Sequence, residues 1–310
     1  MLRSVVIRLV SLDAARTQAT HGHHAHALFM ALIRQADPEL AQRLHDLNGE
    51  KPFTVSPLLE ERRRRHQKHQ PAPGQEYSLR FTLLSEVLFG TLMERFLKPG
   101  NHVPVSLGGA TFAVAGIDSS ATGNGWAAAI DETALLAGAQ PGAEIQLEFA
   151  TPTSFSRGAR PWGRSVDLLP TPTNVFDSLA RRWNTLVAQP KGLPPVDLRQ
   201  LSGFVGDHVM VSRLERVETR ALRFSHGLQL GFCGLVAYTV QGVTGTGAEA
   251  NSVDQARIVD WLGDFAFYSG VGSKTTMGMG QVRRLRRQAR LAAGASEREG
   301  RGESNAGSMD

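Results

Sequence analysis

Two residues that could carry acid–base and electrostatic chemistry stand six positions apart, His45 and Lys51. An imidazole titrates near neutral pH and can give or take a proton, and an ammonium group can stabilise charge that builds on a phosphate. RNA carries its own nucleophile, the 2′-hydroxyl beside each phosphate, so its cleavage needs only a base, an acid for the 5′ leaving oxygen and a cation. The pair suits that chemistry. A plain surface histidine beside a solvated lysine is the simpler interpretation.

His45 is expected at the C-terminal end of a short helix. Asp37-Pro38-Glu39 opens this helix with an Asp N-cap and a Pro at the first helical position, and Asn48-Gly49 ends it. The helix dipole favours a protonated imidazole at that end, which suits His45 as a general acid. Lys51 stands where a strand over 52–55 is predicted to begin, and there it suits stabilisation of the phosphorane.

Four histidines lie close together before this helix: His21, His23, His24 and His26. His23 and His26 share one face of a helix predicted over 22–36. Imidazoles bind zinc, copper and nickel, but no carboxylate or cysteine stands nearby to complete a site, so we predict no metal and no cofactor. For His23 and His26, a second proton-transfer group, an RNA contact and a plain polar face all remain open.

A segment over 265–283 alternates glycine with apolar residues, after a predicted helix and before a predicted strand. Glycines let a backbone approach a phosphate chain and expose amide donors. A tight structural loop explains the spacing equally well. The segment is not a Walker loop, because no Gly-Lys-Ser/Thr opens a helix, and a dinucleotide fingerprint would follow a strand. The residues predicted to contact phosphates here are Gly270, Gly272, Lys274, Gly278, Gly280 and Arg283.

An arginine run lies in a loop predicted between two strands, soon after His45 and Lys51. Runs of charge are usually solvated faces, but this position favours contact with a nucleic-acid backbone, which would make binding salt-dependent. The run consists of Arg62, Arg63, Arg64 and Arg65. Weaker candidates of the same kind are Arg157, Arg160 and Arg164.

The elements that must position these residues follow one order in both halves of the chain. In the first half, hydrophobic periodicity predicts a strand, two helices, two strands, a helix and two strands, over 3–10, 22–36, 38–48, 52–55, 77–83, 85–97, 102–106 and 111–117. In the second half it predicts a strand, a helix, two strands, a helix and a strand, over 144–149, 174–187, 207–216, 221–240, 252–267 and 281–283. Each half follows the βαββαβ order of the ferredoxin-like fold, which the common RNA-recognition fold shares.

We therefore predict an α+β protein with two tandem ferredoxin-like domains. The first covers 1–130 and carries His45, and the second covers 140–287 and carries the glycine-rich segment. The remaining stretch, 288–310, is rich in small and charged residues without an apolar period and is predicted to be disordered. The fold alone names no function, because it serves many.

Composition sets wider limits. The chain has 310 residues, 41% of them hydrophobic, which is enough for a sizeable core. Its net charge of +5 and pI near 9.8 permit a nucleic-acid partner without demanding one. The single cysteine, Cys233, excludes a disulfide framework and a Cys-rich zinc site. No run approaches the roughly 18 apolar residues of a membrane helix, so we expect no membrane partner and a cytoplasmic protein.

Several of these segments, in this order, resemble the CRISPR-associated repeat-RNA-processing endoribonucleases. The stretch from Tyr268 to Arg283 resembles that family's C-terminal glycine-rich loop, and His45 with the block 51–58 resembles its catalytic region. Weaker similarities lie at 151–155, 181–184 and 229–234. The resemblance implies a tandem ferredoxin-like fold, CRISPR repeat RNA as the partner, and one cut in each repeat. Attack by the 2′-hydroxyl would leave 5′-hydroxyl and 2′,3′-cyclic phosphate ends.

The resemblance also carries roles over to single residues. It makes His45 the catalytic histidine and Lys51 a catalytic lysine, and it makes the glycine-rich segment part of the RNA-binding region. A tyrosine of some members falls here on Met30, which cannot transfer a proton. His26 lies one turn before Met30 and His23 two turns before, so both are candidates to replace the missing phenol.

Other interpretations remain open. A non-catalytic repeat-RNA-binding subunit of a CRISPR effector complex would have the same fold, although the presence of both His45 and Lys51 argues against it. A metal-dependent nuclease would need an acidic cluster that the sequence does not show, and a small-molecule-binding protein would need a pocket signature. Association with other CRISPR-associated proteins, or with a second copy of the chain, is also open.

Overall fold

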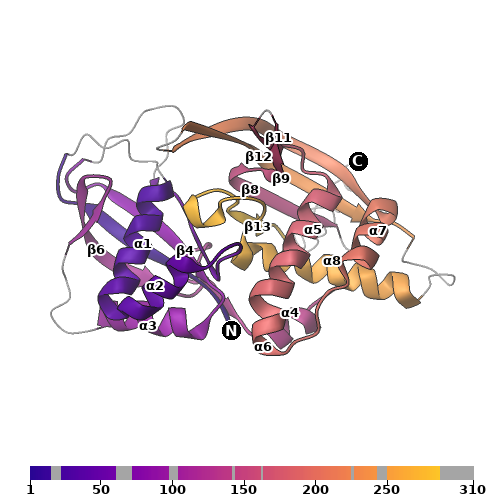
Figure 1. The fold of residues 1–310 in the computed structure, drawn as a ribbon, viewed down its shortest axis with the longest axis horizontal. Coiled ribbons are helices and arrows are strands. Elements are labelled where there is room, and N and C mark those ends of the chain that lie inside the picture. Colours follow the sequence, from indigo (N-terminus) through magenta and orange to yellow (C-terminus); the bar gives the residue numbers. More distant parts are fainter. Residues whose placement is uncertain are drawn as a thin grey trace, which may run out of the picture.

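The computed structural model describes residues 1–14, 22–60, 72–97, 104–141, 144–161, 163–224, 227–242 and 250–286. Two sheets with their helices lie side by side, one from each half of the chain (Figure 1). Three predicted features lie outside the described residues: His21, the arginine run Arg62 to Arg65, and the tail 288–310. These remain predictions.

The first sheet is antiparallel and is centred on β1 (Leu2–Ser11). Alternate residues of β1, among them Val5, Ile7 and Leu9, enter the first hydrophobic core, as a strand with one covered face requires. The strand order is β2-β4-β1-β6-β5, with β3 paired to β4 and β7 to β1. The further strands are β2 (Phe53–Val55), β3 (Leu59–Glu60), β4 (Glu76–Leu83), β5 (Val105–Leu107), β6 (Ala110–Asp118) and β7 (Ala128–Ile130).

Helices α1 (Gly22–Ala36), α2 (Pro38–Asp46) and α3 (Glu86–Leu97) pack on this sheet. The apolar stripe of α1 is buried, including Phe29 and Ile33. Asp37 caps α2, since its Oδ1 accepts from the Leu40 amide at 2.8 Å. The predicted helices and the predicted cap are therefore confirmed.

The second sheet has the strand order β11-β12-β8-β13. Helices α5 (Pro172–Trp183) and α8 (Ala250–Ser269) cover it, and Trp183 meets Phe265 with ring centroids 5.4 Å apart in the core between them. Its strands are β8 (Ile145–Thr153), β11 (Val209–Phe224), β12 (Gly227–Val240) and β13 (Val282–Arg284). A separate hairpin joins β9 (Phe155–Arg160) to β10 (Gly163–Asp167).

The two sheets share one arrangement. When β1, β2, β4 and β6 are numbered 1 to 4 within the first half, and β8, β11, β12 and β13 within the second, both orders read 2-3-1-4. The prediction of an α+β protein with two units is confirmed. The units are not isolated, because Leu2 and Leu84 of the first half belong to the hydrophobic core of the second.

Some elements escaped the sequence analysis. Helix α7 (Leu198–His208) contains Gly203 and Gly206, which lower helix propensity, although Asp197 caps it by accepting from two amides. Also unpredicted are α4 (Glu132–Ala137), α6 (Gln189–Lys191) and the 3₁₀ turn η2 (Thr275–Met277), while the helix predicted over 174–187 continues beyond α5 as the π-helical turn η1 (Asn184–Ala188). None of the helices that the structure describes is long and apolar enough to cross a membrane.

Candidate active site

His45 lies on the last turn of α2 with its side chain exposed. Leu40, Ala41 and Leu44 bury the inner face of this short helix in the first core. His45, the residue after Leu44, therefore points away from this core. The imidazole is accessible to a polynucleotide, as its predicted role requires.

Lys51 holds the end of the helix that carries His45. Its Nζ donates to the carbonyl oxygens of Leu47 at 3.1 Å and His45 at 3.3 Å, and also to that of Leu44. Burial lowers the pKa of Lys51, and the Asp46 carboxylate opposes that shift. The sequence placed this ammonium at the phosphate, whereas the structure engages it with the helix end. A lysine just beyond a helix C-terminus is a signal for this contact.

His26 is half-buried on α1 and faces the glycine-rich loop of the other half. Its Nδ1 lies 3.0 Å from the carbonyl oxygen of Thr276, and its ring stacks on Phe53 with centroids 5.7 Å apart. A carbonyl can only accept, so Nδ1 carries the proton and the neutral ring keeps its lone pair at Nε2. The sequence contained no signal for this carbonyl.

The three candidate groups share one region. Burial is the largest cause that lowers the pKa of His26; the hydrogen bond to Thr276 raises it, and the charges of Lys51 and His45 lower it further. A neutral imidazole with a fixed tautomer thus lies within electrostatic reach of an exposed imidazole and an ammonium. His23, the other candidate on α1, is half-buried with its ring centroid 4.0 Å from that of His24.

The glycine-rich loop packs backbone against backbone. A Cβ on Gly22, at the start of α1, would lie 1.6 Å from the Met277 carbonyl oxygen, so the loop touches the helix directly. The N–H groups of Gly270, Gly272 and Gly280 donate within the protein, to Ala266 O, Ser178 Oγ and Pro152 O at 3.0, 3.1 and 3.0 Å. Three of the four glycine amides are therefore engaged, and close packing explains these glycines. Their contact with RNA stays a prediction.

Lys274 and Arg283 contact different parts of the protein. Lys274 has a left-handed backbone, with φ of 56°, and its Nζ lies 4.7 Å from the centre of the Phe224 ring. Arg283 donates to Glu148 at 2.6 Å and lies 4.7 Å from the Trp126 ring centre.

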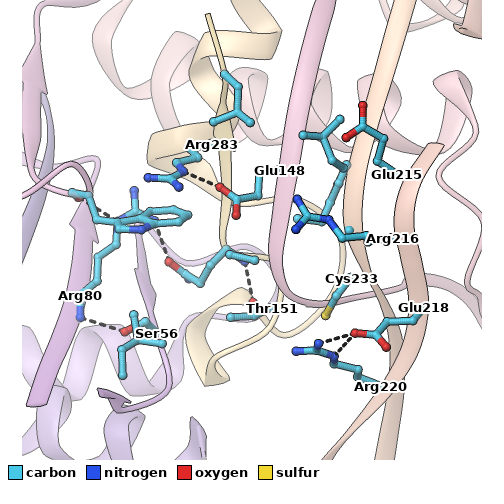
Figure 2. A pocket seen from close by; sticks show the side chains of 18 residues that line it. Ser56, Arg80, Glu148, Thr151, Glu215, Arg216, Glu218, Arg220, Cys233 and Arg283 are labelled. Atoms are coloured by element: carbon cyan, nitrogen blue, oxygen red, sulfur yellow. Dashed lines mark hydrogen bonds and ion pairs between the residues drawn. The ribbon is translucent and has the colours of Figure 1, made fainter. Parts of the chain in front are cut away.

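Arg283 also lines a cavity of about 390 Å³ between the two sheets. Figure 2 shows Arg80, Arg216 and Arg283 around this cavity. His45 is not among the lining residues, so the cavity and the histidine site are separate features.

The weaker arginine candidates lie on the β9–β10 hairpin. Arg157 forms an ion pair with Asp167 at 2.6 Å, and Arg160 is exposed at the end of β9. The side chain of Arg164 lies outside the described part of the chain. Among the described residues, no group of three or more His, Cys, Asp or Glu side chains is arranged to hold a metal ion.

Fold and site together define a two-unit α+β protein whose histidines gather where a loop of the second unit meets the first helix of the first. The family model described as the CRISPR Cas6 N-terminal domain matches residues 1–137, and the model for the CRISPR-associated endoribonuclease Cas6 matches residues 147–282. The chain belongs to the Cas6 family of CRISPR-associated endoribonucleases.

Individual relatives agree with this assignment. The chain is 29% identical to a CRISPR-associated endoribonuclease Cas6 of Mycobacterium tuberculosis over 142 residues, which cover 45% of the chain and 38% of the relative's own length. A solved Cas6 product complex is 27% identical, with a TM-score of 0.68 over 92% of this chain and 99% of that chain. Thermus thermophilus Cas6 is 25% identical, with a TM-score of 0.65 over 92% and 98%.

Proposed function

We propose that this chain is a metal-independent endoribonuclease that binds CRISPR repeat RNA and cuts the precursor transcript once within each repeat. Family membership supports the reaction class, and the similar Cas6 product complex supports RNA as the partner. The observation that carries the mechanism is the hydrogen bond between His26 and Thr276, which joins the two halves at the histidine site.

His26 is the proposed general base. With Nδ1–H donated to Thr276, the free Nε2 can take the proton of the RNA 2′-hydroxyl. The lowered pKa of His26 keeps the ring neutral at physiological pH, as a base requires. This role replaces the tyrosine whose position falls on Met30, a residue buried in the first core.

His45 is the proposed general acid, and Lys51 positions it through the end of α2. The 2′-oxygen attacks phosphorus while the bond to the 5′-oxygen breaks, and His45 protonates the departing oxygen. The products are a 2′,3′-cyclic phosphate and a 5′-hydroxyl. Lys51 adds positive charge near the phosphorane, and the chemistry needs no metal.

The same proposal covers the domains and the RNA contacts. We infer two ferredoxin-like domains, over 1–130 and 140–287, because both halves place their four main strands in the order 2-3-1-4. Lys274, Arg283 and the arginine run at 62–65 are proposed to contact the RNA backbone. Assembly with other CRISPR-associated proteins or with a second copy is compatible with this arrangement.

The test is incubation with candidate repeat RNA in EDTA, comparing the parent, His45→Ala, and RNA with a 2′-deoxy sugar at the cut site. We expect the parent to cut in EDTA, the deoxy substrate to stay intact, and His45→Ala to cut about 10²–10⁴-fold more slowly while still binding RNA. Rapid deoxy-sensitive cutting by His45→Ala would remove His45 from its role. Loss of cutting in EDTA would favour a metal-dependent nuclease. Binding without any cutting would favour the non-catalytic subunit.

A further inference from the structure

A buried arginine of the second half, Arg182, contacts both the glycine-rich loop that faces His26 and the segment that supports the helix of His45. It belongs to α5, and its side chain is only 3% exposed. Its Nη1 donates to the Ser269 carbonyl at 2.9 Å and its Nη2 to the Gly272 carbonyl at 3.0 Å. Nη2 also lies 2.7 Å from Oε2 of Glu50, a residue of the first half.

On one side, Arg182 anchors the start of the glycine-rich loop. Four residues beyond Gly272, the Thr276 carbonyl accepts the hydrogen bond of His26. Between them, the amide of Met277 donates to the Lys274 carbonyl at 2.9 Å within the loop, and the amide of Ser273 donates to the carbonyl of Ser154, outside the loop, at 2.8 Å. A shift at Gly272 is therefore transmitted to the carbonyl that orients His26.

On the other side, Arg182 reaches the support of His45. Glu50 directly precedes Lys51, whose Nζ donates to the last carbonyl groups of α2. The ion pair with Arg182 thus fixes the backbone from which Lys51 reaches the helix end. One guanidinium connects the supports of both proposed proton-transfer groups.

We propose that Arg182 is a positioning residue that holds His26 and His45 in register across the junction of the two halves. The effect of Arg182 on cleavage rests on the proposed function above. The planar guanidinium can serve two carbonyl groups and one carboxylate together, whereas a lysine ammonium is a point charge on a flexible stem. Glu50 compensates the buried charge, so neither partner is replaceable by a neutral group without loss.

The cleavage test compares Glu50→Gln, Arg182→Lys and Arg182→Met. A small misplacement of catalytic groups can cost up to about 10²-fold in rate, so we expect kcat to fall about 10-fold in Glu50→Gln and about 10²-fold in Arg182→Met, with little change in KM. Arg182→Lys keeps the positive charge but should still cut more slowly than the parent. The double variant Glu50→Gln with Arg182→Met should be no slower than Arg182→Met alone, because both changes break one link.

Glu86→Gln is the matched control. Glu86 is 51% exposed and pairs with Arg3 at 3.5 Å and with the N-terminal amine at 3.1 Å, neither of which holds a histidine, so its replacement should leave kcat unchanged. Glu50 is 39% exposed, so Glu50→Gln carries the test if Arg182→Met does not fold. A parent-like kcat in folded Glu50→Gln would overturn the proposal.

A second readout needs no RNA. Titration of the His26 imidazole by NMR should show its pKa moving further below the ordinary 6.5 in Glu50→Gln, because the displaced Thr276 carbonyl no longer accepts the hydrogen bond that raises this pKa. The Glu86→Gln control should titrate as the parent does. If the parent fails to cut repeat RNA, the proposed function fails, yet this titration still decides whether Arg182 holds His26. An unchanged titration would mean that Arg182 serves the fold alone.

Discussion

At the scale of single residues, the two imidazoles that we propose as base and acid have different surroundings. His26 is half-buried, donates through Nδ1 to a carbonyl and has a lowered pKa, so it stays neutral. His45 is exposed at the end of α2, where its imidazole is open to solvent. These different environments are our reason for proposing His26 as the base and His45 as the acid.

The assignment of His26 as the base predicts the acid limb of the pH profile. The base must be neutral to act, so kcat should rise as pH rises through the pKa of His26, which burial places below the ordinary 6.5. We expect His26→Asn to lose this limb and to cut at least about 10²-fold more slowly. The measurement is the rate constant of cleavage against pH under single-turnover conditions.

Asparagine is the informative replacement because its amide can still donate to Thr276 while it cannot accept a proton at neutral pH. A folded His26→Asn with the parent's pH profile would show that another group is the base. His23→Asn, on the same helix, is the variant to examine next.

At the scale of elements, the glycine-rich loop positions His26 by close backbone contact. Gly280 has a φ of 66°, and a Cβ there would lie 2.1 Å from the Val271 carbonyl oxygen. The loop could not close on α1 and β8 with larger residues. Its glycines therefore allow the close packing that places the Thr276 carbonyl beside His26.

The loop's packing predicts a large difference between two glycine variants. Gly192 has nearly the same φ, 65°, but nothing lies within 4 Å of a Cβ added there. Gly192→Ala should therefore cost only the left-handed backbone penalty of about 1–2 kcal/mol and leave cleavage unchanged. Gly280→Ala should destabilise the protein more and slow cleavage, because the Val271 carbonyl must also move. Thermal unfolding with a cleavage assay checks both, and equal stability of the two would contradict the packing argument.

At the scale of the whole molecule, Arg80 ties the halves together. It is 1% exposed on β4, and its guanidinium lies beside the stacked rings of Trp126 and Phe267, 4.9 and 4.3 Å from their centres. It donates to Ser4 Oγ, Trp126 O, Gln281 Oε1 and Phe267 O. Burial lowers the pKa of Arg80 to about 9, which still leaves it charged at neutral pH.

Replacing this group should weaken the junction between the halves. In Arg80→Met, each buried acceptor left without a donor costs about 1–3 kcal/mol. Arg8→Met is the control on the neighbouring strand β1, since Arg8 is 49% exposed and pairs with Asp118 at 3.5 Å, an interaction worth about 0–1 kcal/mol. Urea unfolding followed by probes in both halves measures the effect. Equal losses in the two variants would show that Arg80 does not hold the halves together.

Much of the fold was predictable because its signals are local. The strand at β1, the stripe of α1 and the Asp37 cap each depend on residues a few positions apart. Helix α7 was missed because its glycines obscured a stripe that tertiary packing buries. Predicted phosphate donors such as Gly272 turned out to be engaged, since sequence cannot show what an amide will meet.

The sequence by itself determined the two-unit α+β plan and the exposed His45 at a helix end, because periodicity, caps and turns act over short distances. Only the tertiary structure decided how His26 is oriented. The carbonyl that fixes the His26 tautomer comes from a residue 250 positions away, whereas the Lys51 ammonium turns back onto the helix just before it. The contact of His26 forms only when the chain has folded, so no local pattern could specify it, while a lysine just beyond a helix C-terminus is a local signal.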